Sequence, residues 1–178
     1  DPKEVLRPLV LSYPLGADSQ RTKIVGAEQA VALGADEIDV TLNIPAMLSG
    51  DFRYVRDELR SVVRTVRMTS VNTGKGLVLV KANVEAYYLD EKLKRLVCKI
   101  VEDSGADFIK TSTGAAPGGA TAKDVELFRD LLPESVGVDA SGGICTAEDA
   151  ELMINAGAAR IGTSHAVDII KEFSSDKE

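Results

Sequence analysis

Apolar residues recur along the chain in two alternating patterns, one typical of strands and one typical of helices. Short apolar runs predict six strands, at residues 9–13, 37–42, 76–82, 107–113, 136–141 and 160–164. A segment with helical spacing follows each run, and the clearest begins near Asp51, with apolar residues on one face at Phe52, Val55, Leu59, Val62, Val63 and Val66. This strict alternation predicts an α/β protein whose parallel sheet is covered by helices.

Two of the predicted helices begin with a capping pattern. Thr121 with Asp124, and Thr146 with Asp149, have the spacing in which a threonine hydroxyl and an acidic side chain satisfy the first backbone N–H groups of a helix. We therefore expect helices to start at residues 122 and 147.

An internal repeat relates three of the predicted strands and favours a barrel over an open sheet. Each copy has Gly-Ala, an isoleucine four residues after the glycine, and then Asp39, Lys110 or Gly162. These are alternate strands, which in an eight-stranded barrel contribute side chains to the same interior layers. We predict that Asp39 and Lys110 point inward at matching height and that Gly162 leaves space beside them.

Lys110 lies near the end of a short β-branched run, within the strand predicted at 107–113, and a glycine-rich loop that includes Gly114 follows this strand. Burying an amine is costly, and the adjacent loop favours a functional lysine at the mouth of a barrel. The alternative is a structural ion pair between Lys110 and Asp39, which is a common arrangement. The residues alone leave both interpretations open.

Two further loops predict an anion site. Gly142 and Gly143 follow the fifth predicted strand, while Gly162 and Ser164 close the sixth. Each loop leads into a helix whose first N–H groups have no helical partners, and the last two strands of a barrel are where many barrels bind phosphate. Tight turns between strand and helix are the alternative explanation for these glycines.

Composition narrows the function classes. The chain has 178 residues, 44% of them hydrophobic, which predicts a single domain over residues 1–178. A net charge of −7 without any basic block disfavours nucleic acid or an anionic membrane as a partner. Cys98 and Cys145 show no metal-ligand or redox spacing, and no signal peptide is visible, which predicts a cytoplasmic location.

The motifs around these residues resemble deoxyribose-phosphate aldolase. The similarity lies in residues 33–40, 107–114, 117–121, 136–144 and 156–164, and the element Lys-Thr-Ser-Thr-Gly at 110–114 is the most specific. The resemblance implies a (β/α)8 barrel of the TIM type and a class I aldolase that cleaves 2-deoxy-D-ribose 5-phosphate to D-glyceraldehyde 3-phosphate and acetaldehyde. It implies no metal and no other cofactor, and a homo-oligomer, with a dimer as the expected state.

The resemblance also implies roles for individual residues. Lys110 would form the Schiff base and Asp39 would assist proton transfer. The residues expected around the phosphate are Gly114, Gly142, Gly143, Gly162 and Ser164. The chemistry requires a neutral amine to attack a carbonyl, whereas a free lysine is mostly protonated at neutral pH.

The sequence departs from the family pattern at several positions. Asp139 stands where the family has a second lysine, a change that favours the protonated form of Lys110. Cys145 stands where an arginine commonly follows Gly-Gly, and His165, the only histidine, replaces a serine. His165 either contacts the phosphate or lies on the surface. Lys81, at the end of another strand, either compensates for the missing lysine or is a structural lysine whose amine reaches solvent.

These departures leave three hypotheses about chemistry, and the missing units also leave open a purely structural fragment that is completed by a partner. The first is an active aldolase, and the second is a non-catalytic member in which Asp139 neutralises Lys110 while the loops still bind a sugar phosphate. The third is a metal-assisted aldol reaction with Asp39 and Asp139 as oxygen ligands. The family's first two βα units have no counterpart before Leu9, so we expect a domain that is incomplete at its N-terminal side, or completed by a partner, or remodelled.

Overall fold

The computed structural model describes residues 5–175, and its core is one parallel sheet of six strands. The strands are β1 (Pro8–Leu11), β2 (Glu37–Thr41), β3 (Leu79–Asn83), β4 (Phe108–Lys110), β5 (Gly137–Ser141) and β6 (Arg160–Gly162). They pair side by side in chain order, and every pairing is parallel. The prediction of six strands in a parallel sheet is confirmed.

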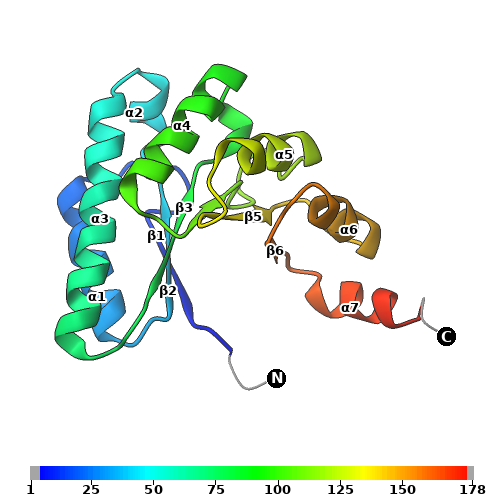
Figure 1. Ribbon diagram of the computed structural model, residues 1–178, viewed down its shortest axis with the longest axis horizontal. Helices are drawn as coiled ribbons and strands as arrows, with labels where there is room; N and C mark the ends of the chain where they lie inside the picture. Colours follow the sequence, from blue (N-terminus) through cyan, green and yellow to red (C-terminus); the bar gives the residue numbers. More distant parts are fainter. Residues whose placement is uncertain (1–4, 176–178) are drawn as a thin grey trace.

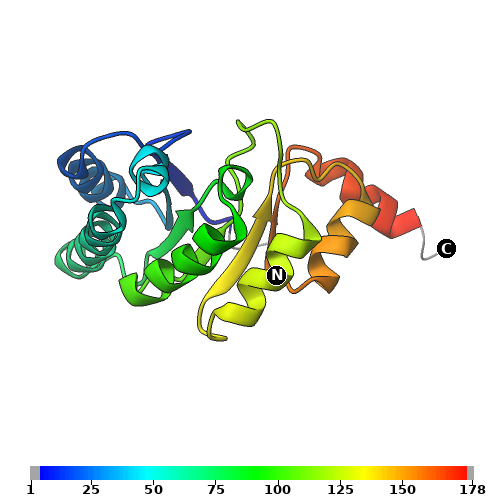
Figure 2. The ribbon, with the colours of Figure 1, turned by 90° about the horizontal axis from the view of Figure 1, so that it is seen from above.

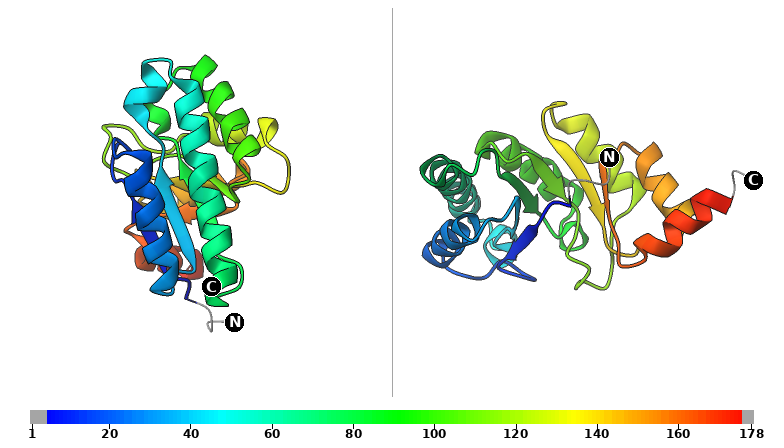
Figure 3. Two further views of the ribbon diagram at one scale, coloured as in Figure 1. Left: turned by 90° about the vertical axis from the view of Figure 1, so that its left-hand side faces the viewer. Right: turned by 90° about the horizontal axis from the view of Figure 1, so that it is seen from below.

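Helices connect the strands and cover one side of the sheet. They are α1 (Gln20–Ala32), α2 (Ile44–Leu48), α3 (Phe52–Thr73), α4 (Glu91–Ser104), α5 (Ala122–Leu131), α6 (Ala147–Asn155), α7 (Ala166–Ser175) and the single 3-10 turn η1 (Ala86–Tyr88). Figure 1 shows this alternation, and Figures 2 and 3 show the sheet curled into an arc with the long helices along its outer side. The fold is a curled half-barrel, in which β1 and β6 each have one neighbour among the described strands.

The two faces of the sheet differ in polarity because successive strand residues point to opposite sides. The outer face is apolar and packs against the helices, with buried residues at Ile38, Val40, Val80, Ala82, Ile109, Val138 and Ala140. The inner face is polar, with Glu37, Asp39, Thr41, Lys81, Asn83, Lys110, Asp139, Ser141 and Arg160. A packed outer layer thus holds a row of charged side chains on the concave side.

The predicted capping boxes differ in outcome. Thr146 and Asp149 form the complete box at the start of α6. Thr121 accepts a hydrogen bond from the Asp124 N–H at the start of α5, as predicted, but the Asp124 side chain pairs with Lys94 at 2.6 Å instead of returning to the helix start. The Asp124 carboxylate thus binds a lysine of the neighbouring helix α4 and does not cap the backbone of its own helix.

Strand β4 is shorter than the predicted run at 107–113, because a side chain takes over the pairing beyond Lys110. The Thr111 hydroxyl donates to the Ser141 carbonyl at 3.1 Å and accepts from the Ser141 N–H at 3.0 Å. The chain after Lys110 is therefore held against β5 without continuing the strand. This leaves the loop after Thr111 free to turn over the end of the sheet.

Among the helices of the described part of the chain, none is long and apolar enough to cross a membrane.

Candidate active site

Lys110 and Asp39 meet on the inner face of the sheet, as the repeat predicts. The Lys110 Nζ atom donates to Asp39 Oδ2 at 2.6 Å, from β4 to β2. The Lys110 side chain keeps 18% of its surface exposed and the Asp39 side chain 5%, so the amine reaches open space while the carboxylate is buried. The predicted geometry of this pair is confirmed, and its catalytic role stays a prediction.

Lys81 lies at the centre of the charged inner face. Its Nζ atom is 2.9 Å from Glu37 Oε2, 3.0 Å from Asp139 Oδ2 and 3.8 Å from Asp39 Oδ1. Burial alone would lower the pKa of this amine, but the carboxylates of Asp139, Asp39 and Glu37 outweigh burial and raise it. Lys81 therefore remains a buried cation, and the interpretation of a lysine whose amine reaches solvent is wrong.

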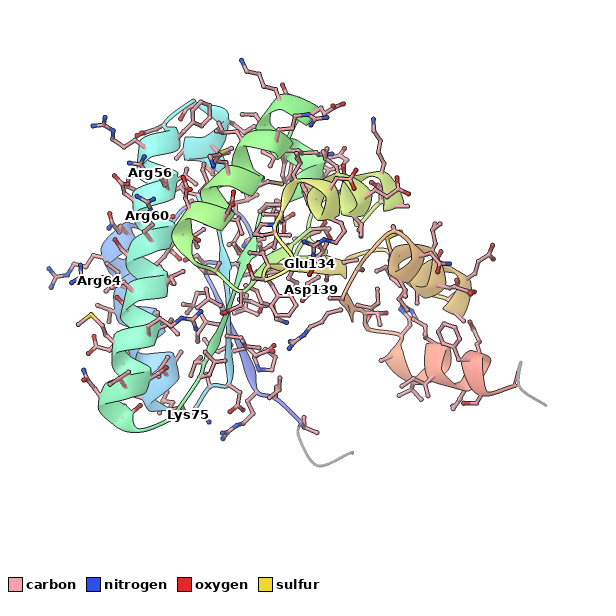
Figure 4. The ribbon with its side chains drawn as sticks, viewed as in Figure 1. Arg56, Arg60, Arg64, Lys75, Glu134 and Asp139 are labelled. Carbon is pink, nitrogen blue, oxygen red and sulfur yellow. The ribbon has the colours of Figure 1, made fainter. Side chains whose placement is uncertain are left out.

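Asp139 occupies the place next to Lys110 on β5, since the two residues are partners in the strand register. Figure 4 labels Asp139 near the middle of the molecule, away from the outer helix α3 that carries Arg56, Arg60 and Arg64. One oxygen of Asp139 is bound by Lys81, and the other, Oδ1, is buried without a hydrogen-bond partner among the described residues. The direct partner of Lys110 is Asp39, whereas Asp139 is compensated through Lys81.

The network continues to Arg160, which donates to Glu37 Oε1 and lies over the Phe108 ring, 4.5 Å from its centroid. Burial alone would raise the pKa of the Glu37 carboxyl, but Arg160 and Lys81 lower it. On the inner face of the half-barrel, three carboxylates thus face three cations. They are Glu37, Asp39 and Asp139, and Lys81, Lys110 and Arg160. Their mutual attraction offsets part of the free-energy cost of burying the charges.

The metal hypothesis finds no support in this geometry. Within residues 5–175, no group of three or more His, Cys, Asp or Glu side chains could hold a metal ion. The Lys81 amine already lies between Asp39 and Asp139, where a cation would have to sit.

A cavity of about 460 Å³ opens beside Lys110 at the carboxyl ends of β4, β5 and β6. Its lining residues are Lys110, Thr113, Gly114, Ser141, Gly142, Gly143, Ile144, Cys145, Gly162, Thr163, Ser164 and His165. The five residues expected around a phosphate all line it together with the predicted Schiff-base lysine. Ser141, which directly precedes the predicted Gly142-Gly143 anion loop, lines the cavity as well and lies two residues after Asp139 on the inner face.

Glycine is required where two loops meet at this cavity. Gly142 has a φ of +91° and Gly143 a φ of +76°, in the left-handed region that disfavours other residues. A Cβ atom on Gly119 would lie 2.1 Å from the Gly142 carbonyl oxygen, which accepts from the Ala120 N–H at 3.0 Å. The loop after β4 can therefore rest directly on the loop after β5 and close one side of the cavity.

Two buried polar residues that the sequence analysis did not single out hold the loop after Lys110. Glu85 is 1% exposed, and its Oε1 atom accepts from the Thr113 N–H and from Asn83 Nδ2. Asn83 is also the register partner of Lys110 on β3. In the sequence, only the location of Asn83 and Glu85 between a strand and the next helical turn could have indicated this role.

A second, smaller cavity of about 90 Å³ lies on the other side of the lysine. It is lined by Val10, Tyr13, Asp39, Thr41, Asn83, Lys110 and Thr113. Lys110 and Thr113 line both cavities, so the Lys110 side chain borders each of the two spaces.

The two cysteines are expected to differ sharply in reactivity. Burial raises the pKa of the Cys98 thiol to about 12, whereas Cys145 is exposed and lines the large cavity. In the folded protein, a thiol-specific disulfide reagent at neutral pH should label Cys145 rapidly and Cys98 only after unfolding. Mass spectrometry checks the site of labelling, and rapid native labelling of Cys98 would contradict the burial described here.

A parallel β/α sheet that carries a lysine–carboxylate pair at the carboxyl ends of its strands, beside a cavity lined by glycine-rich loops, is typical of enzymes built on β/α barrels. Comparison with known proteins narrows this class. Residues 7–169 match the family described as DeoC/LacD family aldolase, and the chain belongs to this family.

Individual relatives agree with the family assignment. The chain is 46% identical to a deoxyribose-phosphate aldolase of Thermoanaerobacter sp. (strain X514) over 165 residues, which are 93% of this chain and 71% of the relative. It is 47% identical to the enzyme of that name from Caldanaerobacter subterraneus subsp. tengcongensis, over 92% of this chain and 68% of the relative.

Solved structures give the same result for the fold. An aldolase called QR15 matches with a TM-score of 0.88 and 37% identity, over 98% of this chain and 75% of that chain. The deoxyribose phosphate aldolase of Aeropyrum pernix matches with a TM-score of 0.84 and 34% identity, over 96% and 69%. The half-barrel thus corresponds to part of the TIM-barrel-type fold of these aldolases.

Proposed function

We propose that this aldolase cleaves 2-deoxy-D-ribose 5-phosphate to D-glyceraldehyde 3-phosphate and acetaldehyde, with Lys110 as the Schiff-base residue. The observation that carries the proposal is the position of Lys110, whose amine is bonded to the Asp39 carboxylate and whose side chain lines both cavities. The name shared by the curated relatives supports the choice of substrate.

The neutral amine of Lys110 attacks the C1 carbonyl of the open-chain sugar, and loss of water gives an iminium ion. A base then takes the proton of the C3 hydroxyl, the C2–C3 bond breaks, and its electron pair moves to the iminium to give an enamine. Glyceraldehyde 3-phosphate leaves at this point. Protonation of the enamine carbon and hydrolysis of the resulting iminium release acetaldehyde and restore the amine. Asp39, at 2.6 Å from Nζ, is placed to take and return these protons.

The two cavities suit the two ends of this substrate. The large cavity has glycines and hydroxyl groups in the loops that lead into α6 and α7, and at the start of α7 a phosphate group would face backbone donors. In this proposal the smaller cavity receives the two-carbon end that becomes acetaldehyde. Gly114, Gly142, Gly143, Gly162 and Ser164 would surround the phosphate.

The test is release of acetaldehyde from deoxyribose 5-phosphate, coupled to an alcohol dehydrogenase, with and without a metal chelator. The proposal expects a rate above background that the chelator does not change. Absence of release by a folded protein would contradict it.

The assembly and location belong to the same proposal. The Aeropyrum pernix structure is described as a tetramer, and for this chain a homodimer in the cytoplasm is our proposal. Light scattering of the purified protein gives the mass that decides the oligomeric state.

A second candidate function is binding of a sugar phosphate without turnover. It is favoured by the ion pair that the Lys110 amine forms with Asp39 at 2.6 Å and by the Asp139 carboxylate beside it in the strand register, because a paired ammonium is not a nucleophile. Thermal stabilisation by deoxyribose 5-phosphate with aldehyde release at background would establish it.

Replacing Asp139 by lysine is expected to raise the rate of cleavage by about tenfold, because a cation beside Lys110 favours its neutral, nucleophilic form. Asp139→Asn, which removes the negative charge without adding a positive one, should give a smaller increase. Steady-state kcat at neutral pH is the measurement. If kcat falls in both folded variants, the Asp139 carboxylate supports cleavage, and the expectation that it slows the reaction is contradicted.

A further inference from the structure

The large cavity has few positive charges for a site that would hold a phosphate group. Among its twelve lining residues, only Lys110 and His165 can carry one. Lys110 is bonded to Asp39 at 2.6 Å. A phosphate monoester carries about −1.5 to −2 charges at neutral pH, and His165 is the other lining side chain that can carry a positive charge to meet it.

The two helices that begin at this cavity differ in what their N-termini already bind. At α6, the N–H groups of Cys145 and Thr146 each donate to Asp149 Oδ2 at 3.0 Å, and the Ala147 N–H donates to Glu172 Oε2 at 2.6 Å. Two carboxylates therefore occupy the position where an anion would bind to α6, and they repel a second anion there. The start of α7 is therefore a more favourable position for a bound anion than the start of α6.

His165 is the residue immediately before α7. Its backbone N–H donates to Thr163 Oγ1 at 2.9 Å, and its Nδ1 atom lies 3.3 Å from the Ser164 hydroxyl. Among the described residues this is the one hydrogen bond of the ring, and it leaves Nε2 available to a ligand. The side chain is exposed and lines the cavity, so an anion can reach it without rearrangement.

We propose that His165, in its protonated form, is a specificity-determining contact to the phosphate group, so that affinity for the anion falls as the imidazole loses its proton. This inference rests on the proposed function of the same site. The other titratable groups around His165 are Lys110 and Cys145 in the cavity, Asp168 one turn along α7, and Asp149 with Glu172 at the start of α6. Protonation places a positive charge on an imidazole that lines the cavity, so the affinity should fall as the pH is raised.

Inorganic sulfate is the probe, because it stays a dianion where the phosphate of the substrate itself titrates. Sulfate binding to the intact protein, measured by titration calorimetry, should weaken about tenfold between about pH 6 and about pH 8. In His165→Ser the affinity should equal the weaker value at both pH values. Arg21→Ser, which removes an exposed cation from α1, should keep the pH dependence of the parent protein.

A pH-independent affinity in the parent protein, or an unchanged affinity in His165→Ser at the lower pH, would overturn the inference. The outcome is separable from that of the proposed function, because covalent trapping of acetaldehyde on Lys110 requires no phosphate. If acetaldehyde is trapped on Lys110 but sulfate binding does not depend on pH, only the proposed role of His165 is contradicted. If no acetaldehyde is trapped, the proposed aldolase reaction is contradicted.

Discussion

Lys110→Met is expected to lower the rate of cleavage by at least about a thousandfold, because methionine has no amine to form the iminium ion on which C–C cleavage depends. The side chain is of similar length and lies at the end of β4, so the strand pairing to Asn83 and Asp139 should persist. The measurement is kcat/KM for deoxyribose 5-phosphate, with circular dichroism as the check on folding.

Lys92→Met is the matched control for this variant. Lys92 is exposed in the first turn of α4, outside both cavities, and its loss should leave the rate unchanged. A folded Lys110→Met protein that retains more than about a tenth of the parent rate would contradict the Schiff-base role.

The second large effect concerns stability. Lys23 on α1 and Glu58 on α3 form an ion pair of 2.6 Å whose side chains are 0% and 1% exposed, and Lys23 also donates to the Thr41 carbonyl at 2.8 Å. Lys23→Met leaves the Glu58 carboxylate buried without its cation, which should lower the free energy of unfolding by about 3–5 kcal/mol. Urea unfolding followed by circular dichroism gives this value.

The double variant Lys23→Met, Glu58→Met is expected to recover most of the loss. Burial lowers the pKa of the Lys23 amine despite the neighbouring Glu58 carboxylate, which indicates that desolvation outweighs the attraction within the pair. Arg95→Met is the surface control, because the Arg95–Glu91 pair of 2.9 Å has side chains 54% and 58% exposed and should contribute far less. A cost for Lys23→Met no larger than that of Arg95→Met would contradict this account.

The sequence was sufficient for the fold and for the convergence of Lys110 with Asp39. Strand and helix periods are local signals, and the repeat relates three alternate strands, so both can be recognised without knowing the register. The resemblance to the family then predicted the four glycines and one serine that line the large cavity.

What could not be predicted depends on contacts between distant strands. The Lys81 amine lies among Glu37, Asp39 and Asp139 because of the register in which β2, β3 and β5 are aligned. The sequence of one strand does not reveal its register with the others. The Lys23–Glu58 pair was missed for a similar reason. Each residue reads as a solvent-exposed charge on its own helix, and only the packing of α1 on α3 buries both.

The central claim is that Lys110 is a nucleophilic amine despite the carboxylates around it. The direct measurement is incubation with acetaldehyde and borohydride, followed by peptide mapping by mass spectrometry. The account predicts an ethyl adduct on Lys110, formed in the parent protein and absent from Lys110→Met. A folded protein with no adduct, or with an adduct on another lysine, would contradict it.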